Sequence, residues 1–258
     1  MAALWFAWLG AIAIGVSLGL LGSGGSILTV PVLVYLLGQD EKVAIAGSLF
    51  VVGCIALAGS TQYYTSKLID WRNVTVFGVP GMVGTYVGAV IAGFVPGIVQ
   101  LVLFAVVMLL ASYMMLRPAE LKAVAVEQRA IWKIGLDGLV VGILTGLVGV
   151  GGGFLIVPAL VLLGGLPMHK AVATSLVIIA MKSFSGFYKY LDVLDSLNLA
   201  LDWHTLLLVT GLGIAGSFAG ARTAHRLPQD SLKKGFGLFL IIMGIYILAR
   251  SLPGAITI

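Results

Sequence analysis

The stretch Gly19-Leu-Leu-Gly-Ser-Gly-Gly-Ser-Ile-Leu-Thr-Val-Pro31 decides the fold, because the chain repeats it as Gly146-Leu-Val-Gly-Val-Gly-Gly-Gly-Phe-Leu-Ile-Val-Pro158. Eight of the thirteen positions are identical in the two copies. Each copy places several glycines inside an apolar run, where the backbone entropy of glycine weakens a helix. The sequence therefore predicts two apolar segments that are each interrupted by a break in the helix.

The composition is that of a protein that crosses a lipid bilayer many times. Of the 258 residues, 60% are hydrophobic and 10% are charged, and the mean hydropathy is +1.13. Apolar runs of about 18 to 25 residues recur along the chain, and each is long enough to cross a hydrocarbon core of about 30 Å as a helix. No basic residue precedes Lys42, so we expect the first apolar run to be retained rather than cleaved as a signal peptide.

The net charge of +5 does not indicate a nucleic-acid partner, because the basic residues lie in short loops between apolar runs. We expect the lipid bilayer as the surroundings and no nucleic acid. The single cysteine, Cys54, excludes an intramolecular disulfide framework and a thiolate metal site. His169, His204 and His225 lack the spacing of metal ligands, so we expect no bound metal.

The duplication extends well beyond the glycine stretch. A shift of 127 residues places Ser48 on Ser175 and Tyr63 on Tyr190, and later positions match at a shift of 132. Small-xxx-small pairs also recur, as Gly84/Gly88 and Gly216/Gly220, and we interpret them as sites of close helix packing inside lipid.

We therefore expect an all-α polytopic membrane protein with two homologous repeats. The first repeat covers residues 1–116, the second covers 134–258, and residues 117–133 form a linker. Each repeat contains one glycine-broken segment followed by three transmembrane helices.

The direction in which each broken segment runs decides the topology. If both segments cross the membrane fully, the basic loop residues divide almost evenly between the two sides and the repeats are parallel. If both turn back as re-entrant hairpins, the repeats are inverted and the basic residues collect on one side, as the positive-inside rule requires. We favour inverted repeats with both termini outside and the linker in the cytoplasm, while full crossing stays open. The hairpin topology gives the linker side Lys67, Arg72, Arg117, Lys122, Arg129, Lys133, Lys170, Arg222, Arg226, Lys233 and Lys234, against Lys42, Lys189 and Arg250 on the other side.

The broken segments are also the candidate binding site. Interrupted backbone inside a bilayer survives only where protein or a watery cavity surrounds it. The helices that resume near Ser26 and Gly153 direct unsatisfied N–H groups and the positive ends of their dipoles toward the breaks, as anion sites require. Two such ends from inverted copies are expected to meet around one anion, as in secondary transporters. The predicted substrate-binding residues in the breaks are Gly22, Ser23, Gly24, Gly25, Ser26, Gly149, Gly151, Gly152 and Gly153.

Four further side chains are substrate-binding candidates. Lys182 stands in the middle of an apolar run, where an ammonium is costly and indicates a functional cavity in which it holds an anion or responds to coupling protons. The alternative is a lysine that snorkels along the helix or faces packed polar groups. Ser48, Ser175 and Thr174 lie one turn into the helix after each break. Their hydroxyls either face the anion or bond back to the preceding turn's carbonyl. Asp137 either carries a coupling proton or complements the start of a helix.

The duplicated pattern Gly-x-x-Gly-x-Gly-Gly-x-x-x-x-x-Pro, followed by Ala-x-Ala-x-Ser-Leu at Ala44 and Ala171, resembles the sulfite exporter TauE/SafE family. The likeness covers nearly the whole chain. It implies transport of sulfur-containing or organic anions, such as sulfite or sulfonates, across a bacterial inner membrane. Val150 and Gly153 stand where the first copy has Ser23 and Ser26, so the resemblance leaves the ligand donors of the second half open.

We therefore expect a secondary transporter that moves a small sulfur-containing or organic anion by alternating access. It needs no cofactor, and a proton or a sodium ion is the expected coupling ion. An anion channel and a non-transport membrane assembly factor stay open as alternatives, as does a homo-oligomer. An intramembrane enzyme requires a set of catalytic side chains deep in the bilayer, and the chain offers only Lys182 and Asp137, so we expect no enzyme.

Overall fold

The computed structural model describes residues 2–22, 24–64, 67–116, 130–150, 153–224 and 228–256, and within these ranges it is helical with no strand. The first half consists of α1 (Ala2–Leu21), α2 (Gly24–Pro31), η1 (Val32–Leu36), α3 (Glu41–Tyr64), α4 (Trp71–Asn73), η2 (Val74–Gly78), α5 (Val79–Gly93) and α6 (Gly97–Leu116). The second half consists of α7 (Ile131–Val148), α8 (Gly153–Pro158), η3 (Ala159–Leu163), α9 (Met168–Ser196), α10 (Trp203–Ala224) and α11 (Gln229–Ile256). The all-α prediction is confirmed for the described residues.

The linker predicted over residues 117–133 ends earlier than expected at its C-terminal boundary. Helix α7 begins at Ile131, so the last residues of the 117–133 segment are already helical. Residues 117–129 lie outside the described residues. Helix α9 extends over 29 residues, from Met168 to Ser196.

The first broken segment folds back on itself as a helical hairpin. A Cβ atom at Gly25 would overlap the backbone of Ile14, and one at Gly10 would lie 3.2 Å from Val32 Cγ1. Positions on α2 and η1 thus meet earlier positions on α1 as the chain proceeds, so the two helical arms are antiparallel. In the second segment, Asp137 of α7 likewise lines a small pocket together with Leu160 of η3.

Proline determines the backbone of both returning arms. Pro31 and Pro158 end α2 and α8, and each is followed by a five-residue π-helix. Proline lacks the N–H of a regular helix and its ring crowds the carbonyl four residues earlier, so the hydrogen-bond pattern widens at this point. The two copies thus reproduce the same local distortion.

The left-handed backbone positions also repeat between the halves. Gly22 has φ +73° and Gly149 has φ +71°, while Gly38 and Gly165 have φ +66° and +65°. These pairs are separated by the 127-residue shift found in the sequence. Asp70 and Asp202 are a further pair, because each accepts a hydrogen bond from the backbone N–H three residues later and so begins a helix. The Thr205 hydroxyl also donates to the exposed Asp202 carboxylate, and these bonds lower the pKa of Asp202.

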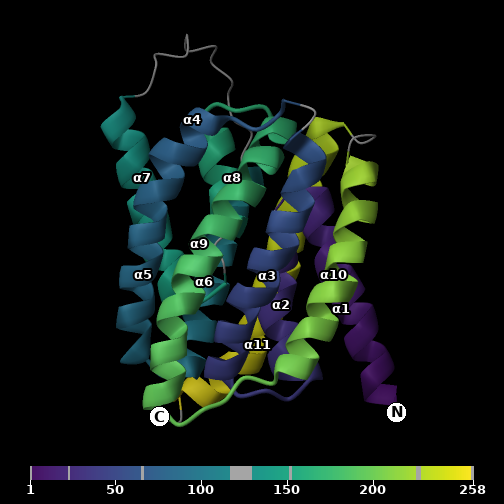
Figure 1. Cartoon of the computed structure of the whole chain (residues 1–258), viewed down its shortest axis with the longest axis vertical. Helices are drawn as coiled ribbons and strands as arrows, with labels where there is room; N and C mark the ends of the chain where they lie inside the picture. Colours follow the sequence, from purple (N-terminus) through teal and green to yellow (C-terminus); the bar gives the residue numbers. More distant parts are fainter. Residues whose placement is uncertain are drawn as a thin grey trace.

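The long helices pair with helices of the other half. α5 packs along α7, α1 packs along α10, and α6 packs along α11 (Figure 1). At the centre, α3 and α9 are antiparallel, since a Cβ at Gly53 would contact Ser183 and one at Gly59 would contact Leu176. Every one of these pairs joins a helix of one half to a helix of the other.

Small residues permit the closest of these helix contacts. A Cβ at Gly84 or Gly88 on α5 would overlap the backbone of α7, and one at Gly216 or Gly220 would fall on the backbone of α1. The expected role of both small-xxx-small pairs in helix packing is thereby confirmed.

Six of the described helices are long and apolar enough to cross a membrane, so the chain is a multi-pass membrane protein. Five of them lie in α3, α5 with its preceding turns, α9, α10 and α11. The sixth is α7, which we had expected to be the first arm of a broken segment, whereas Gly97–Tyr113 of α6 falls in the shorter class. Length alone therefore does not separate hairpin arms from crossing helices.

Candidate functional site

Each glycine turn is seated against a helix of the other half. At Gly22 a Cβ would lie 2.8 Å from the Cα of Val172 on α9, and at Gly149 it would overlap Ile45 on α3. Both glycines also have the positive φ that side chains disfavour. Each turn thus requires glycine for two reasons, the backbone conformation and the close approach to the other half's helix.

Two serines hold these turns through what we call the cross-half hydrogen bonds. Ser48 Oγ on α3 donates to the carbonyl oxygen of Gly149 at 2.8 Å, and Ser175 Oγ on α9 donates to the carbonyl oxygen of Gly22 at 3.1 Å. Each hydroxyl also lies 2.8 Å from a carbonyl of its own helix. The back-bonding expected from the sequence is confirmed, whereas contact of these serines with an anion stays a prediction.

Two tyrosines hold the same hairpins from within their own halves. Tyr63 Oη lies 3.4 Å from the carbonyl oxygen of Gly19, and Tyr190 Oη lies 3.3 Å from that of Gly146. Gln100 Nε2 on α6 reaches the end of α7 as well, at 2.6 Å from the Leu147 carbonyl oxygen. The 127-residue shift that relates Tyr63 to Tyr190 was the signal in the sequence that points to a shared role for the two tyrosines.

The two turns lie at different levels of the central helix pair. The Gly149 turn is seated beside Ser48, and the Gly22 turn is seated beside Ser175, next to Leu176, which contacts the position of Gly59. Ser48 and Gly59 are separated along α3 by about 16 Å at 1.5 Å per residue. The helices that resume after the turns, α2 and α8, are in contact with each other. The expectation that their ends meet around one anion stays a prediction.

The remaining turn residues have packing roles where the structure describes them. Ser26 is fully buried in α2, and Gly25 packs against α1. Gly24 and Gly153 begin α2 and α8. The predicted ligands Ser23, Gly151 and Gly152 lie outside the described residues.

Thr174 serves a neighbouring loop. Its fully buried Oγ1 accepts a hydrogen bond at 3.0 Å from the backbone N–H of Asp70. Asp70 in turn caps α4. In this conformation Thr174 therefore fixes the entry to α4, and its predicted contact with substrate remains untested.

Lys182 lies near the middle of α9 and is fully buried. Its Nζ has no hydrogen-bond partner among the described residues, and it lies 5.6 Å from the centre of the Phe77 ring. The snorkelling alternative is excluded for this conformation, because the ammonium does not reach solvent. Asp137 is partly buried and lines the small pocket between α7 and η3.

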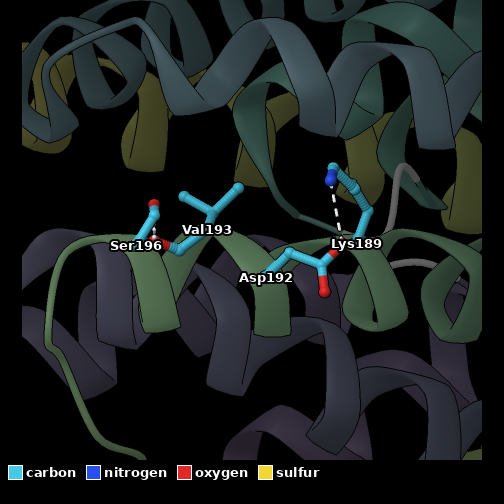
Figure 2. Close-up of polar contacts among 4 residues, drawn as sticks. All are labelled: Lys189, Asp192, Val193 and Ser196. Atoms are coloured by element: carbon cyan, nitrogen blue, oxygen red, sulfur yellow. Dashed lines mark hydrogen bonds and ion pairs between the residues drawn. The ribbon is translucent and has the colours of Figure 1, made fainter.

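A groove between the ends of α5 and α9 contains a second group of polar side chains. Figure 2 shows Lys189 directed at Asp192 one turn later on α9, with Nζ–Oδ2 at 2.9 Å, and Ser196 bonded back to the Val193 carbonyl oxygen. Val90 and Phe94 complete the walls. Exposed ion pairs of this kind contribute little stability, and the polar groups already have partners, so we assign no ligand to the groove.

The described residues include no group of three or more His, Cys, Asp or Glu side chains that could hold a metal ion.

Residues 7–247 match the model of the family "Sulfite exporter TauE/SafE". The chain belongs to this TauE/SafE family. This match confirms the resemblance identified from the sequence.

Several proteins that are similar to this chain are named as probable membrane transporters. A "Probable membrane transporter protein" of Xylella fastidiosa strain 9a5c is 32% identical over 249 residues, covering 92% of each chain. The "Probable membrane transporter protein YunE" of Bacillus subtilis is 29% identical and covers 87% of this chain and 90% of its own. A Methanocaldococcus jannaschii relative, also a "Probable membrane transporter protein", is 25% identical. No solved structure matches the chain.

Proposed function

We propose that this TauE/SafE protein is a secondary transporter that moves a small sulfur-containing or organic anion by alternating access. The observation that supports this most is the reciprocal seating of the glycine turns. Each turn belongs to one half and is bonded to a helix of the other half. A movement of one half relative to the other must therefore change the surroundings of both turns.

The proposed transporter consists of two inverted repeats. The hairpin contacts of α1 with α2 favour broken segments that return to the side they entered, which leaves each half with three crossings. Such a topology collects most basic loop residues on the linker side, in agreement with the positive-inside rule. The paired left-handed positions and the exchange of helix partners between halves are consistent with a pseudo-two-fold relation.

In the proposed transport cycle, the two cross-half hydrogen bonds open one after the other. Both bonds are present in the observed conformation, which we take as the closed state. A neutral hydrogen bond contributes only about 0.5–1.5 kcal/mol net, so thermal motion and substrate binding are sufficient to exchange it. Opening at Ser175 releases the Gly22 turn and opening at Ser48 releases the Gly149 turn, at different levels of the α3–α9 pair.

Transport by purified protein in liposomes tests the proposed function. We expect uptake of sulfite or methanesulfonate to saturate and to respond to an imposed proton or sodium gradient. Ser48→Ala and Ser175→Ala should each slow uptake several-fold, because a buried glycine carbonyl loses its partner at a cost of about 1–3 kcal/mol. Ser112→Ala is the matched control, since among the described residues the buried Ser112 hydroxyl bonds within its own helix alone, at 2.7 Å from the Leu109 carbonyl oxygen.

Flux that rises linearly with concentration and ignores every gradient would indicate a channel instead. No flux of any sulfur oxyanion, sulfonate or carboxylate would reject anion transport and favour the assembly-factor alternative. Equal slowing by Ser112→Ala would show that the serine effects come from general loss of helix stability.

A further inference from the structure

The pocket that holds Lys182 exists twice in the molecule. A Cβ built on Gly81 would lie 3.1 Å from Cδ of Lys182, a residue of the second half, and 3.2 Å from the carbonyl oxygen of Gly138. In the first half, the equivalent of Lys182 is Ile55, which packs against Gly213 beside the Ala11 carbonyl oxygen. Gly213 and Ala11 are the repeat partners of Gly81 and Gly138, so Lys182 and Ile55 occupy equivalent surroundings.

The comparison of the two pockets shows that packing does not require a lysine. Ile55 fills its pocket with hydrocarbon and is fully buried. Lys182 places an ammonium in the same setting without a hydrogen-bond partner among the described residues. Burying an uncompensated charge costs several kcal/mol, so the lysine lowers stability relative to an aliphatic side chain. A side chain with such a cost is retained for a purpose other than packing.

The surroundings of Lys182 have changed together with its charge. The Phe77 ring lies 5.6 Å from Nζ, a distance at which an aromatic face attracts a cation. The repeat partner of Phe77 is the aliphatic Val209. At equivalent positions of the repeat, an ammonium and an aromatic ring in one pocket thus correspond to two aliphatic side chains, Ile55 and Val209.

We propose that Lys182 is the charge-binding group for the transported anion, and that the single ammonium selects monoanions over dianions. This inference rests on the proposed anion transport and names the substrate class. The other buried lysine, Lys42, already donates to the carbonyl oxygens of Ala92 and Val95, both at 2.5 Å. One ammonium therefore remains to neutralise a ligand among the described residues, and a dianion would keep one charge uncompensated in the bilayer.

Asp137 of α7 is the residue before Gly138 and lines a small pocket with Phe77 and Leu160. Lys182 Nζ has no hydrogen bond to any described residue, acidic side chains included. In this proposal the anion is the hydrogen-bond partner that the ammonium lacks in the closed state.

Uptake of labelled methanesulfonate into liposomes at one fixed pH tests this assignment. We expect Lys182→Ile and Lys182→Gln to raise KM at least tenfold, while Lys182→Ile remains folded and at least as heat-stable as wild type. Ile55→Leu, at the equivalent position, is the matched control and should keep KM within about twofold. Unlabelled sulfate should compete at least tenfold more weakly than unlabelled methanesulfonate.

A wild-type KM in Lys182→Ile would overturn the assignment. If Lys182→Ile keeps the wild-type KM but its uptake no longer responds to an imposed pH gradient, Lys182 handles a coupling proton rather than the anion, and the assignment is likewise overturned. Sulfate that competes as well as methanesulfonate would overturn the monoanion preference. If wild type itself takes up no anion, the proposed function fails, whatever the variants do.

Discussion

Gly149→Ala is expected to abolish transport and to lower the thermal stability of the protein markedly. At φ +71° an alanine costs about 1–2 kcal/mol in backbone strain. Its Cβ would also overlap Ile45 and would lie 3.1 Å from Tyr190 Oη, so the turn would be pushed away from α3. The hydrogen bond from Ser48 to the Gly149 carbonyl oxygen would then be lost as well. Thermal unfolding in detergent and uptake into liposomes measure the two effects.

Gly165→Ala separates backbone strain from loss of the contact between halves. Gly165 has nearly the same positive φ, +65°, but nothing lies within 4 Å of a Cβ at this position. We expect Gly165→Ala to lose only the stability that the strain costs and to keep transporting. Equal defects in the two variants would contradict the importance of the seated turn.

Gly88→Leu is expected to prevent assembly of the folded protein. A Cβ at Gly88 would overlap the carbonyl oxygen of Ile143 on α7, so a leucine would force α5 and α7 apart along their shared seam. Helix association inside lipid depends on such close backbone contact, because no hydrophobic driving force replaces it. Size-exclusion chromatography after detergent extraction should give aggregate in place of the single peak of wild type.

Gly211→Leu on α10 is the matched control for this substitution. Gly211 is exposed, and nothing lies within 4 Å of a Cβ built there. We expect Gly211→Leu to elute as wild type does, since the side chain would extend into lipid. Aggregation of both variants would mean that leucine is tolerated poorly on any helix, and the seam would lose its special role.

Much of the fold was predictable from the sequence because a gene duplication provides two readings of each element. Apolar length predicted the helices, and the shared glycine stretch predicted both breaks. The seams at Gly84 and Gly216 followed from the need for close packing in lipid. Helix length was misleading for two helices. α7 is as long as a crossing helix although it was expected to be the first arm of a broken segment, and the apolar part of α6 is shorter than a crossing helix although α6 was expected to cross.

The candidate site was predictable in its residues but not in its geometry. The matched serines were found from the repeat, yet one sequence copy does not reveal that Ser48 bonds to the turn of the other copy. Such contacts depend on the packing between halves, which leaves no local pattern. The expected meeting of the helix ends at Ser26 and Gly153 around an anion stays a prediction, and α2 and α8 are in contact. Lys182 was recognised from the energetic cost of an ammonium in lipid. The equivalent aliphatic residue, Ile55, became informative only because the structure places both side chains in corresponding pockets.

The central claim is that the two halves have opposite orientations in the membrane, since alternating access through reciprocal turns depends on it. Arg72 and His204 are repeat partners and both are exposed, so single cysteines there report equivalent positions of the two halves. In a Cys54→Ala background, Arg72→Cys and His204→Cys are exposed to a membrane-impermeant maleimide in intact cells and in inverted vesicles. We predict that the two cysteines are labelled from opposite sides, with Arg72→Cys reached only in inverted vesicles. Labelling of both from the same side would contradict the inverted arrangement and the mechanism built on it.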